Sequence, residues 1–362
     1  MEYPKFKVTV SCMTYNQSKY ITDAMNGFTM QQTSFPFVCT IVDDASTDGE
    51  QEVIRKYVED NFDFSEGSVA YHKETDYAHI TYAQHKTNKN CYFAVLYLKE
   101  NHYSKHKDKS PYLKDWRDGV EYMAICEGDD YWIVPDKLEK QVKFLDENED
   151  YVMVHTNLKW YIQNSDKFIY KNEWKEFNTF FERKQDRIVE NILDSNRYYV
   201  QTNTVLFRNK VYDSVFHELV QINNKFLLGD TTLWCLLHKY GYIHYDETIT
   251  SIYRINSGSV SHQSGIEKKL RFYLSGSEMR LFMYNYLDID NKQLFNKFNA
   301  EYKKIFFLYR AYNRNYVRFI EMKWNFKLFE RFYEGLDMRV ISIFIKHTLN
   351  LYLYLKNLFK QM

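Results

Sequence analysis

Two adjacent carboxylates, Asp129 and Asp130, are the residues of this sequence best placed to do chemistry. They follow an apolar run at 122–126 that is typical of a buried strand, and helical periodicity resumes after Pro135. The pair is therefore expected at the carboxyl end of a strand, where open α/β sheets bind ligands. Because adjacent negative charges repel, the pair favours either a divalent cation that also binds diphosphate oxygens or a polar turn.

Four residues of two predicted loops have side chains suited to a nucleobase: Thr14, Tyr15 and Asn16 in the first loop and Asp44 in the second. An aromatic ring can stack on a base while polar neighbours bond the edge of that base. A carboxylate can accept the N3–H of uracil, which cytosine lacks. The residues leave two alternatives open: Tyr15 could belong to the core, and Asp44 could be a turn residue.

Asp230 and His262 complete the set of candidates. Asp230 precedes a helical pattern at 231–240, where a carboxylate can cap the helix and still present an oxygen to a cleft. His262 ends the loop at 254–262, and a neutral imidazole can complete the coordination of Mn²⁺ or Mg²⁺. The plain alternatives are a helix N-cap and a surface histidine.

The spacing of apolar residues predicts the elements that position these side chains. A strand–helix–strand–helix order over 5–58 favours a parallel sheet with crossover helices, and hence the α/β class. The segment 65–119 is less regular apart from one apolar run, and the segment 168–194 is ambiguous, mostly helix or loop. The predicted strands are 5–12, 37–42, 91–98, 122–126, 151–155 and 199–207, with a hairpin or paired strands at 243–253, and the predicted helices include 21–28, 53–58 and 231–240.

The chain divides into a predicted catalytic domain at 1–262 and an aromatic, basic, helical region at 263–362. Residues 338–362 contain no Asp or Glu. A basic amphipathic helix of this kind can lie on an anionic membrane surface. It can equally dock on the catalytic domain or on another subunit of a homo-oligomer.

The composition limits the function classes. Lys+Arg and Asp+Glu both number 48, so there is no charge excess for nucleic acid. Five scattered cysteines without zinc-ligand spacing fit a reducing compartment. Neither a signal-peptide core after Met1 nor a run of about 18 apolar residues is found. We therefore expect a cytoplasmic protein whose C-terminal region can contact the inner face of the cell membrane.

Five ordered stretches resemble the bacterial family-2 inverting glycosyltransferases, which have the GT-A fold. These stretches are 8–16, 42–48, 126–132, 228–231 and 253–262. The resemblance implies a Rossmann-like nucleotide-binding domain with a mixed, mainly parallel sheet flanked by helices. It does not cover the region after His262. The sequence departs from the family pattern at Met13, where proline is common, and in an acidic motif that reads Gly-Asp-Asp rather than Asp-x-Asp.

The resemblance also implies roles for the donor-binding residues. Thr14, Tyr15 and Asn16 would line the nucleobase pocket, and Asp44 would bond the uracil. Asp129 would approach the ribose or a metal-bound water.

For the reaction itself, the resemblance implies a metal site and a base. Asp130 would bind Mn²⁺ or Mg²⁺ directly, and His262 would approach the metal or the diphosphate. Which carboxylate of the Asp129–Asp130 pair contacts the metal is left open. Asp230 would take the proton of the acceptor hydroxyl.

We therefore predict a metal-dependent, hexosyltransferase-type enzyme that moves a sugar from a nucleotide-sugar donor, in particular a UDP-sugar. The acceptor would be a hydroxyl of a glycan or lipid-linked glycan in the synthesis of surface polysaccharide such as capsule. A sugar nucleotidyltransferase is one alternative, although 13–20 lacks the glycine of a phosphate-binding loop. A catalytically silent nucleotide-sugar-binding scaffold is another, although Asp130 and Asp230 are present.

Overall fold

The computed structural model describes residues 3–194, 197–223, 226–256 and 265–313. The chain forms two compact units, 1–256 and 257–362. The domain boundary predicted at 262 lies in the segment 257–264, outside the described residues.

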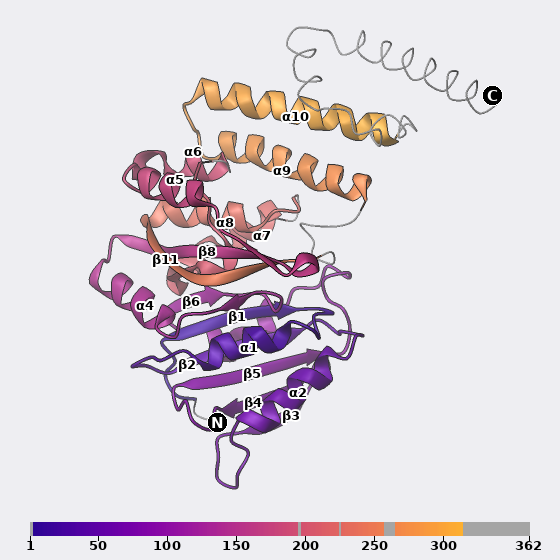
Figure 1. The fold of residues 1–362 in the computed structure, drawn as a ribbon, viewed down its shortest axis with the longest axis vertical. Coiled ribbons are helices and arrows are strands. Elements are labelled where there is room, and N and C mark those ends of the chain that lie inside the picture. The colour runs from indigo at the N-terminus through magenta and orange to yellow at the C-terminus, as the bar shows by residue number, and fades with distance from the viewer. Residues whose placement is uncertain (1–2, 195–196, 224–225, 257–264, 314–362) are drawn as a thin grey trace, which may run out of the picture. The chain divides into compact units, whose positions relative to one another are not determined.

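One mixed sheet organises the first unit, and parallel strands form its centre (Figure 1). Its middle runs in the order β5, β2, β1, β6, and each neighbouring pair is parallel. β2 and β5 are buried along their whole length and β5 reads as a continuous apolar run, because both of their faces are covered. Their bounds are β1 (Val8–Thr14), β2 (Phe37–Asp43), β5 (Cys91–Leu98) and β6 (Tyr122–Ile125).

Antiparallel strands extend this centre on both sides. Beyond β5 lie β4 and β3, and beyond β6 lies β10, which separates β6 from the parallel pair β8 and β11. Strands β7 and β9 pair antiparallel with β11 and β8. Their bounds are β3 (Tyr71–Glu74), β4 (Ala78–Gln84), β7 (Tyr131–Trp132), β8 (Tyr151–Ile162), β9 (Lys167–Ile169), β10 (Leu206–Arg208) and β11 (Tyr242–Ile255).

The prediction of a mixed, mainly parallel sheet is confirmed, but two strand predictions are wrong. The segment predicted as a hairpin is the single strand β11, which absorbs polar residues through register shifts between Asp246 and Ser251. The strand predicted at 199–207 is mostly irregular. A 3₁₀ turn, η4 (Thr202–Thr204), interrupts it, and only β10 forms.

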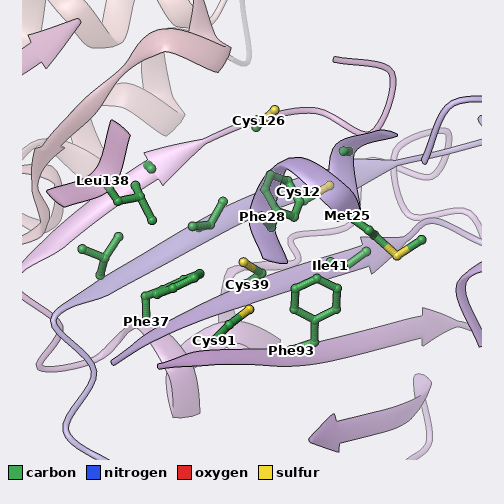
Figure 2. Packing of buried hydrophobic residues seen from close by; sticks show 14 of the residues in the cluster. Cys12, Met25, Phe28, Phe37, Cys39, Ile41, Cys91, Phe93, Cys126 and Leu138 are labelled. Carbon is green, nitrogen blue, oxygen red and sulfur yellow. The ribbon is translucent and has the colours of Figure 1, made fainter. Parts of the chain in front are cut away.

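Helices cover both faces of the sheet. Residues of α1, α2 and α4 share one core with the inward faces of β1, β2, β5 and β6, including Cys12, Cys39 and Cys91 among phenylalanine rings (Figure 2). A second core on the other face includes Leu113 and Trp116 of η1 and α3. The helices are α1 (Ile21–Thr29), α2 (Glu50–Asn61), α3 (Lys114–Arg117), α4 (Lys137–Glu147), α5 (Asn172–Glu182), α6 (Ile188–Leu193), α7 (Asn209–Asn223) and α8 (Asp230–Leu237), with 3₁₀ turns η1 (Ser110–Leu113), η2 (Gln163–Ser165), η3 (Gln185–Arg187) and η5 (His238–Tyr240).

The described part of the second unit is a pair of helices, α9 (Ile266–Tyr286) and α10 (Lys292–Asn313). Arg280 and Glu301 form an ion pair at 3.4 Å, and the rings of Tyr284 and Phe295 lie 5.3 Å apart, so the two helices pack together. This confirms the helical character predicted after 263. The segment 338–362 lies outside the described residues. Within the described ranges, no helix combines the length and apolarity that crossing a bilayer requires.

Candidate functional site

A pocket of about 490 Å³ lies beside the carboxyl ends of β1 and β6. Met13, Met123 and Ile125 line it from the sheet, the segment 107–113 forms one wall, and residues of α7 and α8 form another. Of the residues that the structure describes, three acidic ones line it: Asp108 from the wall at 107–113, Glu127 shortly after β6, and Asp230 at the start of α8. Its volume lies within the range of small-molecule sites.

Glu127 follows β6, and its carboxylate accepts a 2.9 Å hydrogen bond from the Thr202 hydroxyl. Burial raises the pKa of Glu127, and the charges of Asp129 and Asp230 raise it further. Met123, Ile125 and Glu127 alternate along the chain and all line the pocket, as expected for one face of a strand. The sequence prediction missed Glu127.

Asp230 is the first residue of α8, and Gly229 is the N-cap, so the prediction of Asp230 as an N-cap is wrong. One oxygen of Asp230 accepts the Thr231 N–H at 2.8 Å. Burial raises the pKa of Asp230, and that hydrogen bond partly offsets the rise. A carboxylate with a raised pKa beside a pocket is suited to accept a proton.

The adjacent carboxylates Asp129 and Asp130 accept hydrogen bonds from the end of β11 and from the residue that follows it. Asp130 is 2% exposed and accepts the backbone N–H of Arg254 at 2.8 Å. Burial, followed by repulsion from Asp129 and Glu127, raises the pKa of Asp130. Asp129 accepts a 3.0 Å hydrogen bond from the Asn256 amide. Neither lines the pocket itself, but both lie beside Glu127, which does.

Tyr199 connects the two acidic positions in space. The negative charges of Asp230 and Asp130 both act on its phenol and, together with burial, raise its pKa. The structure therefore brings Asp130 and Asp230 to one region of the molecule, although 100 positions separate them in the sequence.

The first predicted loop is bonded to the second through Glu50, the first residue of α2. The buried Glu50 carboxylate accepts hydrogen bonds from the Thr14 hydroxyl, from the Gln17 N–H at 2.8 Å and from the Ser46 hydroxyl at 2.8 Å. Burial raises the pKa of Glu50. The sequence prediction did not include Glu50, which fixes the two loops relative to each other.

Tyr15 and Asn16 lie at the tip of the first loop. Asn16 adopts a left-handed backbone conformation with φ of 54°, donates its N–H to the Ser46 hydroxyl at 2.9 Å and accepts the Thr47 N–H at 2.8 Å. Tyr15 is 45% exposed, so the alternative of a core residue is excluded. Its ring is available to stack on a planar ligand.

Gly128 allows the segment that carries Asp129 and Asp130 to approach the first loop. A Cβ at this position would lie 2.6 Å from Oε1 of Gln17 and still closer to the Thr14 hydroxyl. Only glycine fits this approach without displacing one of those side chains. The site from β1 and the site from β6 are therefore in direct contact.

Asp44 holds a segment that lines the pocket. Its buried carboxylate accepts the N–H groups of His102 and Tyr103 at 2.7 and 2.9 Å and the Lys109 ammonium at 3.2 Å. A carboxylate offers about four acceptor positions, and three of those of Asp44 are used within the protein. The predicted contact with uracil stays a prediction, and the anchoring of residues 102–109 is an additional role.

Three cations line the pocket that the sequence prediction did not single out: Lys107, Lys109 and Arg117. Lys107 and Lys109 belong to an irregular segment, and Arg117 ends the short helix α3, which is too short to give a periodic signal. Lys107 pairs with Glu100, and Lys109 pairs with Asp44.

The predicted metal site stays a prediction. His262 lies outside the described residues, and within the described ranges no three His, Cys, Asp or Glu side chains converge as a metal cluster. The donor type nevertheless fits Mn²⁺ or Mg²⁺, because Asp129 and Asp130 carry carboxylate oxygens and repel each other, a repulsion that the charge of Arg254 offsets only in part.

Comparison with known proteins finds sequence relatives that are themselves uncharacterised, and solved structures that are only distantly similar. No family model matches the chain. Uncharacterised proteins of Mycobacterium bovis and Mycobacterium tuberculosis are 30% identical over 211 residues, which cover 58% of this chain and 49% of theirs. The match thus spans about half the length of these curated relatives.

Among solved structures, the chain is similar to residues 1–349 of Staphylococcus aureus TarS, with a TM-score of 0.45, 16% identity and coverage of 88% of this chain and 75% of that one. TarS 1–349 in complex with UDP matches with a TM-score of 0.44, 16% identity and coverage of 89% and 76%. The complex with UDP-GlcNAc matches with a TM-score of 0.44, 15% identity and coverage of 85% and 73%.

Proposed function

We propose that this protein is an inverting glycosyltransferase that moves a hexose from a UDP-sugar to a hydroxyl of a glycan or lipid-linked glycan. The observation that carries the proposal is the meeting of Asp230 and Glu127 on one pocket of about 490 Å³. This pocket lies at the carboxyl ends of parallel strands, where α/β sheets bind nucleotides.

Asp230 is the proposed general base. The acceptor hydroxyl gives its proton to the Asp230 carboxylate while its oxygen attacks the anomeric carbon of the donor sugar. The bond from that carbon to the diphosphate oxygen breaks, and the electron pair leaves with the nucleoside diphosphate. One in-line displacement inverts the anomeric configuration, and the raised pKa of Asp230 makes it a better proton acceptor than an exposed aspartate.

The first two loops are the proposed nucleobase site. In this proposal the exposed ring of Tyr15 stacks on the uracil, Thr14 and Asn16 flank the base, and Asp44 accepts its N3–H. Glu50 supports this site by holding Thr14 against the second loop.

We further propose that Mn²⁺ or Mg²⁺ binds at the acidic segment, with Asp130 as a ligand, Asp129 close to the ribose or to a metal-bound water, and His262 near the diphosphate. The ion would offset the negative charge of the leaving diphosphate as a Lewis acid. The oxygen-rich donor set and the mutual repulsion of its carboxylates support this assignment.

The setting of the reaction is also a proposal. We propose that the protein contributes to surface polysaccharide at the cytoplasmic face of the membrane, with the basic segment 338–362 binding anionic lipid. Deleting 338–362 should move the protein from the membrane fraction to the supernatant. An unchanged distribution would favour a docked helix instead.

The function is tested by incubating the purified protein with a panel of UDP-sugars, with and without Mn²⁺, and measuring released UDP. We expect release from at least one UDP-sugar, and we expect Asp130→Asn to lose the effect of the metal on UDP affinity. UDP binding without any turnover would favour a nucleotide-sugar-binding scaffold. If the unaltered protein and Asp130→Asn each bound UDP equally well with and without Mn²⁺, the assignment of the metal site would be wrong.

A further inference from the structure

Arg117, the last residue of α3, lines the pocket with a guanidinium that donates no hydrogen bond to any residue that the structure describes. Its side chain is only 13% exposed. The nearest carboxylate oxygens, of Asp213 and Asp118, lie 3.9 and 4.0 Å away, beyond hydrogen-bond distance. Its Nε is buried without a partner among the described residues.

The other pocket cations are hydrogen-bonded to carboxylates, whereas the ion pairs of Arg117 with Asp118 and Asp213 are longer, at 4.0 and 3.9 Å. Lys107 is bonded to Glu100 and Lys109 to Asp44, so their charges are compensated within the protein. Arg117 instead lies 5.9 Å and 5.6 Å from the ring centroids of Tyr212 and Phe216 on α7. Aromatic faces attract a cation, but they supply no acceptors for its five N–H groups.

A largely desolvated guanidinium without acceptors is unfavourable unless a ligand supplies them. The planar fork of arginine matches the two oxygens of a carboxylate or a phosphate. The position of Arg117 also separates it from the nucleotide. Lys109 is tied to Asp44, which we assign to the nucleobase, whereas Arg117 contacts α7 on another wall of the pocket.

We propose that Arg117 binds an anionic substituent, a carboxylate or a phosphate, on the sugar that is transferred or on the acceptor. This inference rests on the proposed function and adds a substrate class to it, namely acidic sugars. Arg117 then selects between substrates that share the same nucleotide. It is a binding residue distinct from the lysines on the nucleotide side of the pocket.

The test is calorimetric titration of the full chain, its Arg117→Gln variant and a matched control, Lys143→Gln, which removes an exposed cation from α4. The donor arm compares UDP, UDP-glucose and UDP-glucuronic acid. The acceptor arm titrates glucuronic acid and glucose 6-phosphate into the UDP complex. The two arms distinguish an acidic group on the donor from one on the acceptor.

In one of the two arms, the unaltered protein and Lys143→Gln should bind the acidic ligand about 10-fold more tightly than the neutral one, as one charged hydrogen-bonded pair provides. The neutral ligand is UDP-glucose in the donor arm and glucose in the acceptor arm. Arg117→Gln should lose this preference and keep its affinity for UDP. Its Tm without ligand should fall only slightly, because no hydrogen bond among the described residues is lost and only the ring contacts and the two ion pairs near 4 Å are removed.

Two results would overturn the inference: no preference for acidic ligands in the unaltered protein, or a loss of UDP affinity in Arg117→Gln, which would place the arginine on the diphosphate. A large fall in the Tm of Arg117→Gln would show a structural role and would equally overturn it. If the unaltered protein binds no uridine nucleotide, the proposed function fails first, and that outcome is distinct from a lost preference alone.

Discussion

The hydroxyl of Thr202 donates a 2.9 Å hydrogen bond to Oε2 of Glu127 and thereby joins η4 to the end of β6. Glu127 in turn shares the pocket with Asp230. Three segments that are far apart in the sequence therefore meet at one pair of carboxylates. The partner of Glu127, Thr202, lies in a 3₁₀ turn, whereas the sequence predicted a strand at 199–207.

Replacing Thr202 tests the importance of this contact for turnover. Thr202→Val keeps the shape of the side chain and removes the donor, so we expect kcat to fall by about 10-fold or more, as for a lost hydrogen bond to a charged group. Steady-state kinetics with the best UDP-sugar would measure it. Thr202→Ser keeps the hydroxyl and is the matched control. Equal rates for the two variants would show that the contact does not support the reaction.

The pH dependence of the reaction should report Asp230. Burial disfavours the charged form and raises the pKa above its ordinary value of 3.8, and a general base must be deprotonated to act. We therefore expect kcat/KM to fall on the acid side through a midpoint higher than that of an exposed aspartate. A profile of kcat/KM against pH measures this midpoint, and a midpoint in the ordinary aspartate range would contradict the assignment.

The same shift affects stability with a defined sign. Because the folded pKa of Asp230 lies above the unfolded one, the folded state binds more protons between the two values and loses stability as pH rises through that window. At neutral pH the charged Asp230 is therefore unfavourable in the folded state. Asp230→Asn is accordingly expected to have a Tm at least as high as that of the unaltered protein.

Gly128→Ala tests the close approach of the acidic segment to the first loop. The added Cβ would lie 2.6 Å from Oε1 of Gln17 and closer to the Thr14 hydroxyl, so we expect weaker UDP binding together with a lower Tm. Gly67→Ala is the control for replacing a glycine, because nothing lies within 4 Å of its Cβ and only its positive φ is strained. Unchanged UDP affinity in Gly128→Ala would show that the approach of the acidic segment to the first loop does not matter for nucleotide binding.

Lys137, the first residue of α4, should make stability depend on pH. Its ammonium is buried, donates a 2.7 Å hydrogen bond to Gln141 and lies 4.4 Å from the Trp132 ring, and burial lowers its pKa to about 7. Between about 7 and the ordinary value of 10.5 the unfolded chain binds a proton that the folded chain does not, so stability rises with pH.

Lys137→Met removes this titration. Its Tm relative to the unaltered protein should be highest at neutral pH and should decline as the solution becomes alkaline. Thermal melts of both proteins at neutral and at alkaline pH measure the difference in Tm. Lys143→Met, an exposed lysine on the same helix, should show no such trend. A constant Tm difference across this range would mean that Lys137 stays protonated in the folded protein.

Much of the sheet could be predicted from the sequence because β2 and β5 are buried on both faces and β5 reads as a continuous apolar run. β11 could not, since Asp246, Glu247 and Thr248 look like a turn and only the bulges of the folded ladder keep them in one strand. η4 likewise depends on tertiary contacts, such as the bond from Thr202 to Glu127.

The candidate site was predicted in part. Asp230, Tyr15 and Asp129 lie at strand and helix ends that periodicity locates. Glu127 carried a usable signal, because Met123, Ile125 and Glu127 alternate on one face of β6. Arg117 and Lys109 carried none, since α3 is too short to give a periodic signal and Lys109 belongs to an irregular segment that Asp44 anchors.

The most direct test of the account is the turnover of Asp230→Asn with the best UDP-sugar, measured beside UDP affinity on the same preparation. Glu176→Gln, which alters an exposed carboxylate on α5, is the matched control. The account predicts a loss of about 10²- to 10⁴-fold in kcat for Asp230→Asn, with UDP affinity retained, because a positioned general base is removed. Turnover equal to that of the unaltered protein would contradict it.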